Sequence, residues 1–178
     1  MIKKIIQDEK KHLRVINFTE SGETSFNIDT EILPPNIALL PDGDHKAYYL
    51  SWRPNSGLYM DIPSTPNSVE PHIFLTANLS GCCVGVQNCG TKIRLRHYNL
   101  DDTDNIIFSQ NDLSRYGDNI FWLMPNDKYK KTGIKNAKFY THPSNGADAI
   151  FWGEYTSKKW NFYYQNGNYD TKIISFNY

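Results

Sequence analysis

A cysteine and a histidine fifteen residues apart are the side chains of this sequence best suited to nucleophilic chemistry. Cys82 follows Ser80-Gly81, a turn signal before an expected strand, and the glycine lets main chain approach a ligand closely. Apolar residues and arginines alternate along residues 93–98, which places His97 on the apolar face of a strand. A thiol needs a base or a positive neighbour to become a thiolate at neutral pH, and a histidine supplies one.

The residues alone leave two other interpretations open. A free cysteine is among the most frequently buried residue types, so Cys82 and His97 can be ordinary core residues. A metal site would draw on these two together with Cys83 and Cys89. Adjacent cysteines point to opposite faces of a strand, so only two cysteines and the histidine could converge, one ligand short of a structural zinc site. We therefore expect no metal. The other four histidines are expected at the surface or at strand ends.

Length and charge exclude several classes of protein. A chain of 178 residues, with 19 basic and 19 acidic side chains, predicts one domain over residues 1–178 and argues against nucleic-acid binding. No apolar run approaches the roughly 20 residues of a membrane-spanning helix. The basic start is followed by further charges before any apolar stretch, so we expect no signal peptide. Three cysteines form no disulfide framework. We expect a monomer that needs no cofactor.

The elements that must position Cys82 and His97 are mostly strands. Aromatic residues make up 14% of the chain and include 12 tyrosines, which favour half-buried sheet surfaces. Residues 2–11 have a weak helical spacing, residues 19–35 are polar and loop-like, and residues 119–124 are ambiguous with a helical interpretation. Residues 58–62 are expected to form a hairpin with the strand at 47–52. The remaining expected strands are 13–18, 72–76, 82–86, 93–98, 138–140, 149–155, 160–164 and 172–176. The fold class is α/β (α+β), a single domain that is mostly strand.

The segment Thr76-Ala77-Asn78-Leu79-Ser80-Gly81-Cys82, followed by His97, resembles the signature of cysteine-dependent protein-glutamine deamidase toxins. The Leu-Ser-Gly-Cys motif is shared by the catalytic domain of the cytotoxic necrotizing factors and by the Burkholderia lethal factor. The lethal factor is the closer likeness, because it is also a free-standing domain with a threonine six residues before its cysteine. The strong part of the resemblance covers roughly residues 72–98. The implied fold is an α/β sandwich of mixed sheets flanked by helices.

The resemblance implies a role for each motif residue. Cys82 would be the nucleophile, His97 the base, and Thr76 the group that orients the imidazole, by its hydroxyl or by its main-chain carbonyl. Main-chain N–H groups of the turn Ser80-Gly81-Cys82 would bind the oxyanion, and the substrate-binding turn consists of Leu79, Ser80 and Gly81. The motif is therefore expected to convert a glutamine of a target protein to glutamate through a thioester.

The same resemblance implies a biological setting. The substrate would be a host protein, by family analogy a translation-initiation RNA helicase, with inhibition of translation, or a Rho-family GTPase. The protein would be a virulence effector made in the bacterial cytoplasm and delivered into the host cytosol, with no membrane and no nucleic acid as a partner. The sequence departs from the family pattern at Cys83, which directly follows Cys82, and at Cys89, which lies in the loop before His97. This loop differs in length from the lethal factor's, and because loops carry recognition, the identity of the target does not carry over. The alternatives are a chemoreceptor-type deamidase acting inside the bacterium, a transglutaminase, and an inactive protein-binding module.

Overall fold

The chain folds into two β-sheets, which the computed structural model describes over residues 1–9, 11–31, 36–54, 56–99, 120–125, 136–141, 148–166 and 173–176. Within these residues the larger sheet has eight strands and the smaller one five. In spatial order the larger sheet consists of β1 (Leu13–Val15), β3 (Ile37–Pro41), β2 (Gly22–Asp29), β4 (His45–Leu50), β6 (Ile73–Thr76), β11 (Ile150–Thr156), β12 (Lys159–Gln165) and β13 (Ile173–Phe176). The smaller sheet consists of β10 (Ala137–Tyr140), β9 (Ile120–Pro125), β7 (Cys83–Asn88), β8 (Lys92–Asn99) and β5 (Ser56–Pro63).

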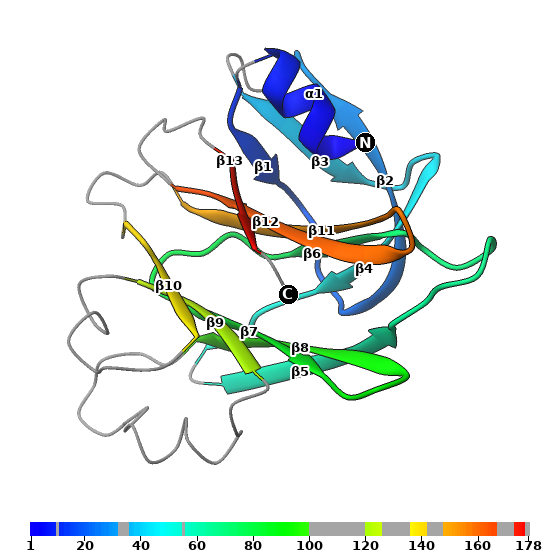
Figure 1. Cartoon of the computed structure of the whole chain (residues 1–178). Coiled ribbons are helices and arrows are strands. Elements are labelled where there is room, and N and C mark those ends of the chain that lie inside the picture. The colour runs from blue at the N-terminus through cyan, green and yellow to red at the C-terminus, as the bar shows by residue number, and fades with distance from the viewer. Residues whose placement is uncertain are drawn as a thin grey trace.

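Both sheets are mixed, as expected for this fold class. Three strand pairs are parallel, namely β1 with β3, β4 with β6, and β10 with β9, and the other described pairs are antiparallel. Figure 1 shows the two sheets stacked, with the helix α1 (Ile2–Glu9) over the part of the larger sheet that faces away from the smaller one. The expected strand-rich α/β sandwich of mixed sheets is confirmed, and in the described part of the chain α1 is the helix that flanks it.

The main core lies between the two sheets. Large aromatic side chains from the larger sheet, such as Phe74 and Phe162, meet aliphatic side chains from the smaller one, such as Val84 and Leu95. A second core lies on the opposite face of the larger sheet, where Ile2 and Ile6 of α1 are buried, so the helical spacing at the start of the sequence is confirmed. None of the helices in the described residues has the length and hydropathy to span a bilayer.

The expectation of a loop over residues 19–35 is wrong, because β2 lies within it. This strand is polar, and Phe26 is its one fully buried side chain. It pairs with β3 on one side and β4 on the other. Main-chain hydrogen bonds to these two neighbours therefore stabilise a strand that the pattern of its side chains does not predict.

Two further expectations about strands are corrected. Residues 120–125 form β9 and not a helix: Trp122 packs on the outer face and Leu123 in the main core, and an apolar run buried on both faces has no strand periodicity. The segment 58–62 lies in β5, which pairs with β8 in the smaller sheet and not with β4. Its buried Ile62 faces the same core as Leu50 of β4, so the two strands pack face to face and not edge to edge.

Most other expected strands are present within one or two residues. These are β4, β6, β7, β8, β10, β11, β12 and β13, and β1 covers the first half of its expected segment. β12 and β13 pair antiparallel.

Candidate active site

Thr76, Cys82 and His97 lie where the chain passes from the larger sheet to the smaller one. Thr76 is the last residue of β6, and Cys82 directly precedes β7. His97 lies in β8 opposite Val84 of β7, and directly opposite residues in an antiparallel pair point to the same face. Val84 belongs to the core between the sheets. His97 therefore points inward, toward the larger sheet that carries Thr76.

The two adjacent cysteines point to opposite faces of the smaller sheet. Cys82 belongs to the main core together with Val84, whereas Cys83 packs with Trp122 on the outer face. Both side chains are buried, at 4% and 2% exposure. Cys82 thus shares the inner face with His97, and Cys83 does not, as alternation along a strand requires.

The hydroxyl of Thr76 fixes the proton of His97. Thr76 Oγ1 lies 3.1 Å from the carbonyl oxygen of Leu50 and 2.8 Å from His97 Nδ1. The carbonyl can only accept, so the single hydroxyl proton goes to Leu50, and the hydroxyl oxygen accepts from Nδ1–H of His97. This assigns the Nδ1–H tautomer and leaves the lone pair on Nε2. Of the two ways in which Thr76 could meet the imidazole, the contact is made by the hydroxyl.

His97 Nε2 is a buried proton acceptor. Its side chain is 1% exposed, and Nε2 has no hydrogen-bond partner in the described part of the protein. Burial lowers the pKa of His97 from 6.5 to about 4, so the ring is neutral near pH 7. A buried polar atom without a partner costs about 1–3 kcal/mol, which makes such an atom a marker for chemical use.

The lowered pKa of His97 predicts a loss of stability in acid. Unfolded histidine binds its proton near pH 6.5, whereas the folded state holds it only near pH 4, so this contribution to stability is complete above 6.5 and lost as the pH falls toward 4. Between about pH 7 and about pH 4.5, the free energy of unfolding should fall by roughly 2–3 kcal/mol more in wild type than in His97→Gln. Urea denaturation at the two pH values measures this difference. Equal falls in both proteins would contradict a buried neutral His97.

Main-chain hydrogen bonds fix the loop that leads to Cys82. The Ala77 N–H donates to the Leu50 carbonyl at 3.1 Å, beside the Thr76 hydroxyl that donates to the same oxygen. Leu79 and Ala149 exchange both main-chain hydrogen bonds, at 2.7 and 3.0 Å. The loop is therefore bound to the larger sheet at both of these points before it reaches Cys82.

Asn78 ties the same loop to the N-terminal strand. Its side-chain oxygen accepts from the Val15 N–H at 3.3 Å, and its side-chain nitrogen donates to the Val15 carbonyl at 3.1 Å. Gln165 binds the residues just before this point in the same way. Its side-chain oxygen accepts from the Leu13 N–H, and its side-chain nitrogen donates to the Lys11 carbonyl. The side-chain amides of Asn78 and Gln165 thus form the hydrogen bonds along β1 that a neighbouring strand would otherwise form. Asn78 belongs to the loop that leads to Cys82.

Tyr140 of β10 bonds to the main chain of both Gly81 and Cys82, a contact that the sequence did not predict. Its fully buried hydroxyl accepts from the Gly81 N–H at 3.0 Å and donates to the Cys82 carbonyl at 2.8 Å. Gly81 has a φ of +106°, a region that favours glycine. Residues 138–140 were expected to form a strand, but nothing in their spacing connects this tyrosine with the motif. The tertiary fold alone makes the contact.

These contacts narrow the expected role of the turn. The N–H groups of Leu79 and Gly81 are occupied by Ala149 and Tyr140, and Leu79 is fully buried. Ser80 is exposed and is the member of the turn that borders a cavity together with Cys82. Of the three turn residues, Ser80 is therefore the one that faces the cavity.

Replacing Tyr140 by phenylalanine should destabilise the turn at Gly81-Cys82, because it removes the hydroxyl that bonds to both residues. Tyr140→Phe leaves the Gly81 N–H and the Cys82 carbonyl without this partner, and the free energy of unfolding should fall by about 1–3 kcal/mol. The rate at which iodoacetamide alkylates Cys82 should change as well, because the turn no longer fixes the thiol. Tyr59→Phe, at an exposed tyrosine of β5, is the matched control and should leave both quantities unchanged. A Tyr140→Phe protein equal to this control would show that Tyr140 does not position the turn.

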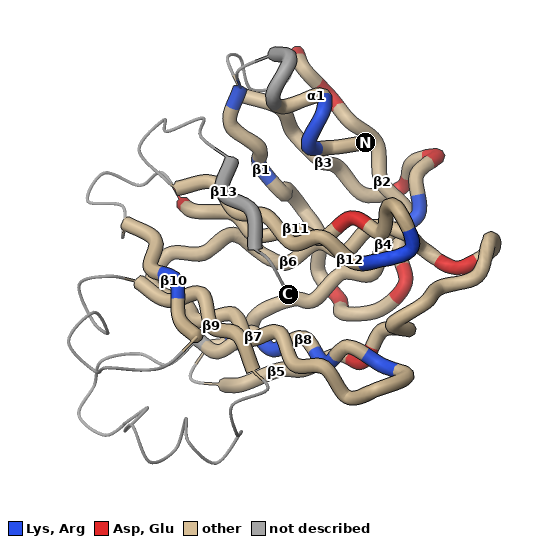
Figure 2. Tube along the Cα trace, viewed as in Figure 1, with Lys and Arg blue, Asp and Glu red and all other residues tan. Residues whose placement is uncertain are grey.

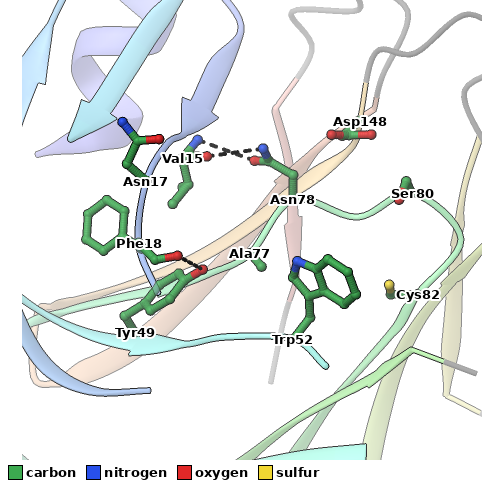
Figure 3. A pocket seen from close by; sticks show the side chains of 10 residues that line it. All are labelled: Val15, Asn17, Phe18, Tyr49, Trp52, Ala77, Asn78, Ser80, Cys82 and Asp148. Atoms are coloured by element: carbon green, nitrogen blue, oxygen red, sulfur yellow. Dashed lines mark hydrogen bonds between the residues drawn. The ribbon is translucent and has the colours of Figure 1, made fainter. Parts of the chain in front are cut away.

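A cavity of about 320 Å³ opens beside the thiol (Figure 3). Two segments far apart in sequence, residues 15–18 and 49–52, form one side of it, and the loop of residues 77–82 forms the other. The lining residues are Val15, Asn17, Phe18, Tyr49, Trp52, Ala77, Asn78, Ser80, Cys82 and Asp148. Cys82 therefore lies on the inner face that also carries His97 and borders this cavity.

Within the described residues, the other cysteines do not combine with Cys82 and His97 into a metal site. Cys89 is exposed in the turn between β7 and β8, and none of the three cysteines forms a disulfide. No group of three or more histidine, cysteine, aspartate or glutamate side chains converges within the described residues.

The other histidines are distributed mostly as expected. His45 begins β4, and His72 directly precedes β6, whereas His142 lies outside the described residues. His12 differs, because it is buried at the start of β1, where its Nε2 lies 2.7 Å from the Asn166 carbonyl oxygen. A contact across 154 residues of sequence gives no local signal.

No family model and no curated protein matches the chain. Among solved structures, the chain is similar to the C-terminal domain of CNFy from Yersinia pseudotuberculosis, with 11% identity and a TM-score of 0.48. The match covers 78% of this chain and 63% of that domain, so the chain spans less than two thirds of the length of that structure. The likeness concerns the fold, and the resemblance of the motif to the lethal factor stays a prediction.

Proposed function

We propose that this protein is a bacterial toxin or effector that converts a specific glutamine of a host protein to glutamate through a thioester on Cys82. The observation that carries the proposal is the hydrogen bond between Thr76 and His97. It keeps Nε2 of a buried neutral imidazole as a proton acceptor on the sheet face that carries Cys82. Thiol catalysis needs a nucleophile, a base and a third group that orients the base.

The first half of the proposed reaction forms the thioester. His97 Nε2 takes the thiol proton, and the Cys82 sulfur attacks the carboxamide carbon of the target glutamine. The resulting oxyanion receives a hydrogen bond on the cavity side of the turn, where Ser80 lies. When the C–N bond breaks, the nitrogen takes the proton from His97 Nε2 and leaves as ammonia.

The second half returns the enzyme to its starting state. Water attacks the thioester carbonyl while His97 accepts its proton, and the C–S bond breaks. The sulfur recovers the proton from His97, and the product is a glutamate side chain. The Nδ1–H bond to Thr76 is needed in both halves, because the ring becomes positively charged twice and must keep the same orientation. The reaction needs no metal or cofactor.

The target and the place of action belong to the same proposal. A host protein is the proposed substrate, with a translation-initiation RNA helicase and a Rho-family GTPase as the two kinds of target that the motif resemblance suggests. A chemoreceptor in the bacterium's own cytoplasm is the second candidate. Transglutamination uses the same thioester with an amine in place of water, and an inactive binding module would use the same scaffold without the chemistry.

The test of the proposed function uses intact Cys82→Ser protein to capture partners from host and bacterial lysates. Captured partners are then treated with wild-type protein and analysed by peptide mass spectrometry for a gain of about 1 Da at a glutamine, the change that hydrolysis of the amide produces. One glutamine converted by wild type and untouched by Cys82→Ser supports the proposal. Conversion only of a chemoreceptor would favour the second candidate, and partners that are never modified would favour the binding module.

A further inference from the structure

The cavity beside Cys82 combines a carboxylate with aromatic rings. Asp148 lines it, and no lysine or arginine is among its described lining residues. Phe18, Tyr49 and Trp52 contribute aromatic rings. Burial raises the pKa of Tyr49 to about 12, so this phenol is uncharged near neutral pH. The rings of Phe18 and Tyr49 pack against each other, with centroids 4.9 Å apart, and Trp52 is the exposed ring. A carboxylate that shares one small opening with an exposed indole is the chemistry that attracts a cation.

Trp52 is more exposed than core packing explains. Its side chain is 47% exposed, although the preceding residue is firmly held. The Ser51 N–H donates to Ser21 Oγ at 2.9 Å, and the two hydroxyl groups lie 2.8 Å apart. Figure 3 shows the indole rising from its strand end toward the opening that Asp148 and Cys82 also border. An exposed indole on a fixed backbone is typical of a recognition surface.

We propose that this cavity takes the side chain of a lysine or arginine that neighbours the target glutamine. Asp148 supplies the opposite charge, and the face of Trp52 covers the cation and its aliphatic stem. A carboxylate has about four lone-pair sites, so Asp148 can bind such a cation beside another donor. This inference rests on the proposed function and adds the chemical class of the segment that is attacked.

The position of the thiol favours a neighbour on the same chain over a separate amine. Cys82 and Asp148 line one cavity of about 320 Å³, near the lower end of the roughly 300–1,000 Å³ of ligand pockets. A glutamine that reaches Cys82 therefore brings its flanking side chains to the walls that hold Asp148 and Trp52. The proposed substrate is a short segment in which glutamine and a basic residue enter together.

Charged thiol reagents test the cation site without knowledge of the target. A methanethiosulfonate forms a mixed disulfide with a thiolate and releases methanesulfinate, and it can carry a trimethylammonium or a sulfonate group. Cys82 of wild-type protein should react roughly tenfold faster with the cationic reagent than with the anionic one, after normalisation to the exposed Cys89. Peptide mass spectrometry measures both sites in one sample. The ratio cancels the intrinsic reactivity of the thiol.

Variants decide whether Asp148 and Trp52 cause this preference. Asp148→Asn should bring the ratio at Cys82 close to that at Cys89, Asp148→Lys should invert it, and Trp52→Leu should lower it. Asp44→Asn removes a carboxylate from a different cavity and should leave the ratio unchanged. A wild-type ratio near one, or a ratio that Asp148→Lys does not change, overturns the inference and leaves the proposed function untouched.

Capped peptides with a single glutamine test the identity of the cation. Wild-type protein should convert a peptide with lysine beside the glutamine roughly tenfold faster than one with alanine there, and Asp148→Asn should bring the ratio of the two rates close to one. An equal loss for both peptides would place Asp148 at the reacting amide and overturn the inference. Cadaverine is a free amine that transglutamination would attach to the glutamine. An Asp148→Asn effect limited to this attachment would also overturn the inference. No conversion of any peptide by wild type would count against the proposed function and against this inference with it.

Discussion

His97→Gln should lower the rate of glutamine conversion by about 10²–10⁴-fold, the range that general acid–base catalysis contributes. Nε2 of this buried imidazole is the proton acceptor on the face that carries Cys82, and a glutamine side chain has no basic nitrogen to replace it. The measurement is the rate of the mass gain of about 1 Da in the captured target.

The loss in His97→Gln must be chemical and not a failure to fold. Glutamine keeps a polar side chain of similar length, and its urea denaturation near pH 7 should show a folded, cooperative protein. His12→Gln is the matched control, because His12 is also buried but lies at β1. A folded His97→Gln protein that keeps wild-type turnover would remove His97 from the mechanism.

Thr76→Val should lower the same rate by about 100-fold while it changes the shape of the core little. Valine replaces the hydroxyl by a methyl group, so Nδ1–H of His97 loses its acceptor and the ring is no longer held in the tautomer that leaves Nε2 unprotonated. The Leu50 carbonyl keeps the Ala77 N–H as a donor, so the cost in free energy of unfolding should stay near about 1 kcal/mol.

Thr76→Ser separates this orienting role from packing. Serine restores the hydroxyl without the methyl group, so it should recover most of the turnover that valine loses, even though it leaves a small void in a fully buried site. A serine variant as slow as the valine variant would indicate that Thr76 matters for packing and not for the orientation of His97.

The candidate site could be predicted from the sequence as far as local pattern reaches. Alternation along residues 93–98 placed His97 on an inner face, and the separation of Cys82 from Cys83 followed from strand geometry. Tyr140 could not be found in this way, since its contact with the turn spans 59 residues of sequence and depends on how β10 lies relative to the residues just before β7. Side-chain hydrogen bonds of such long range leave no periodic trace.

The fold shows the same division between local and long-range information. Strands with one buried face, such as β8, follow from alternation. The strand β2 did not, because it is held by main-chain pairing on both sides and buries one large side chain, Phe26. The partner of β5 could not be read locally either, since its proximity in sequence to β4 suggested a hairpin while the apolar faces of the two strands favour packing across the core.

The most direct test of the central claim compares the alkylation rates of two adjacent thiols. Cys82 and Cys83 are buried to nearly the same degree, but only Cys82 lies on the face of His97, so Cys83 is an internal control. Limiting iodoacetamide between about pH 6 and about pH 7, read by peptide mass spectrometry, should label Cys82 far faster than Cys83, and Thr76→Val and His97→Gln should remove the difference. Equal and slow labelling of the two cysteines in wild-type protein would contradict an activated nucleophile at Cys82.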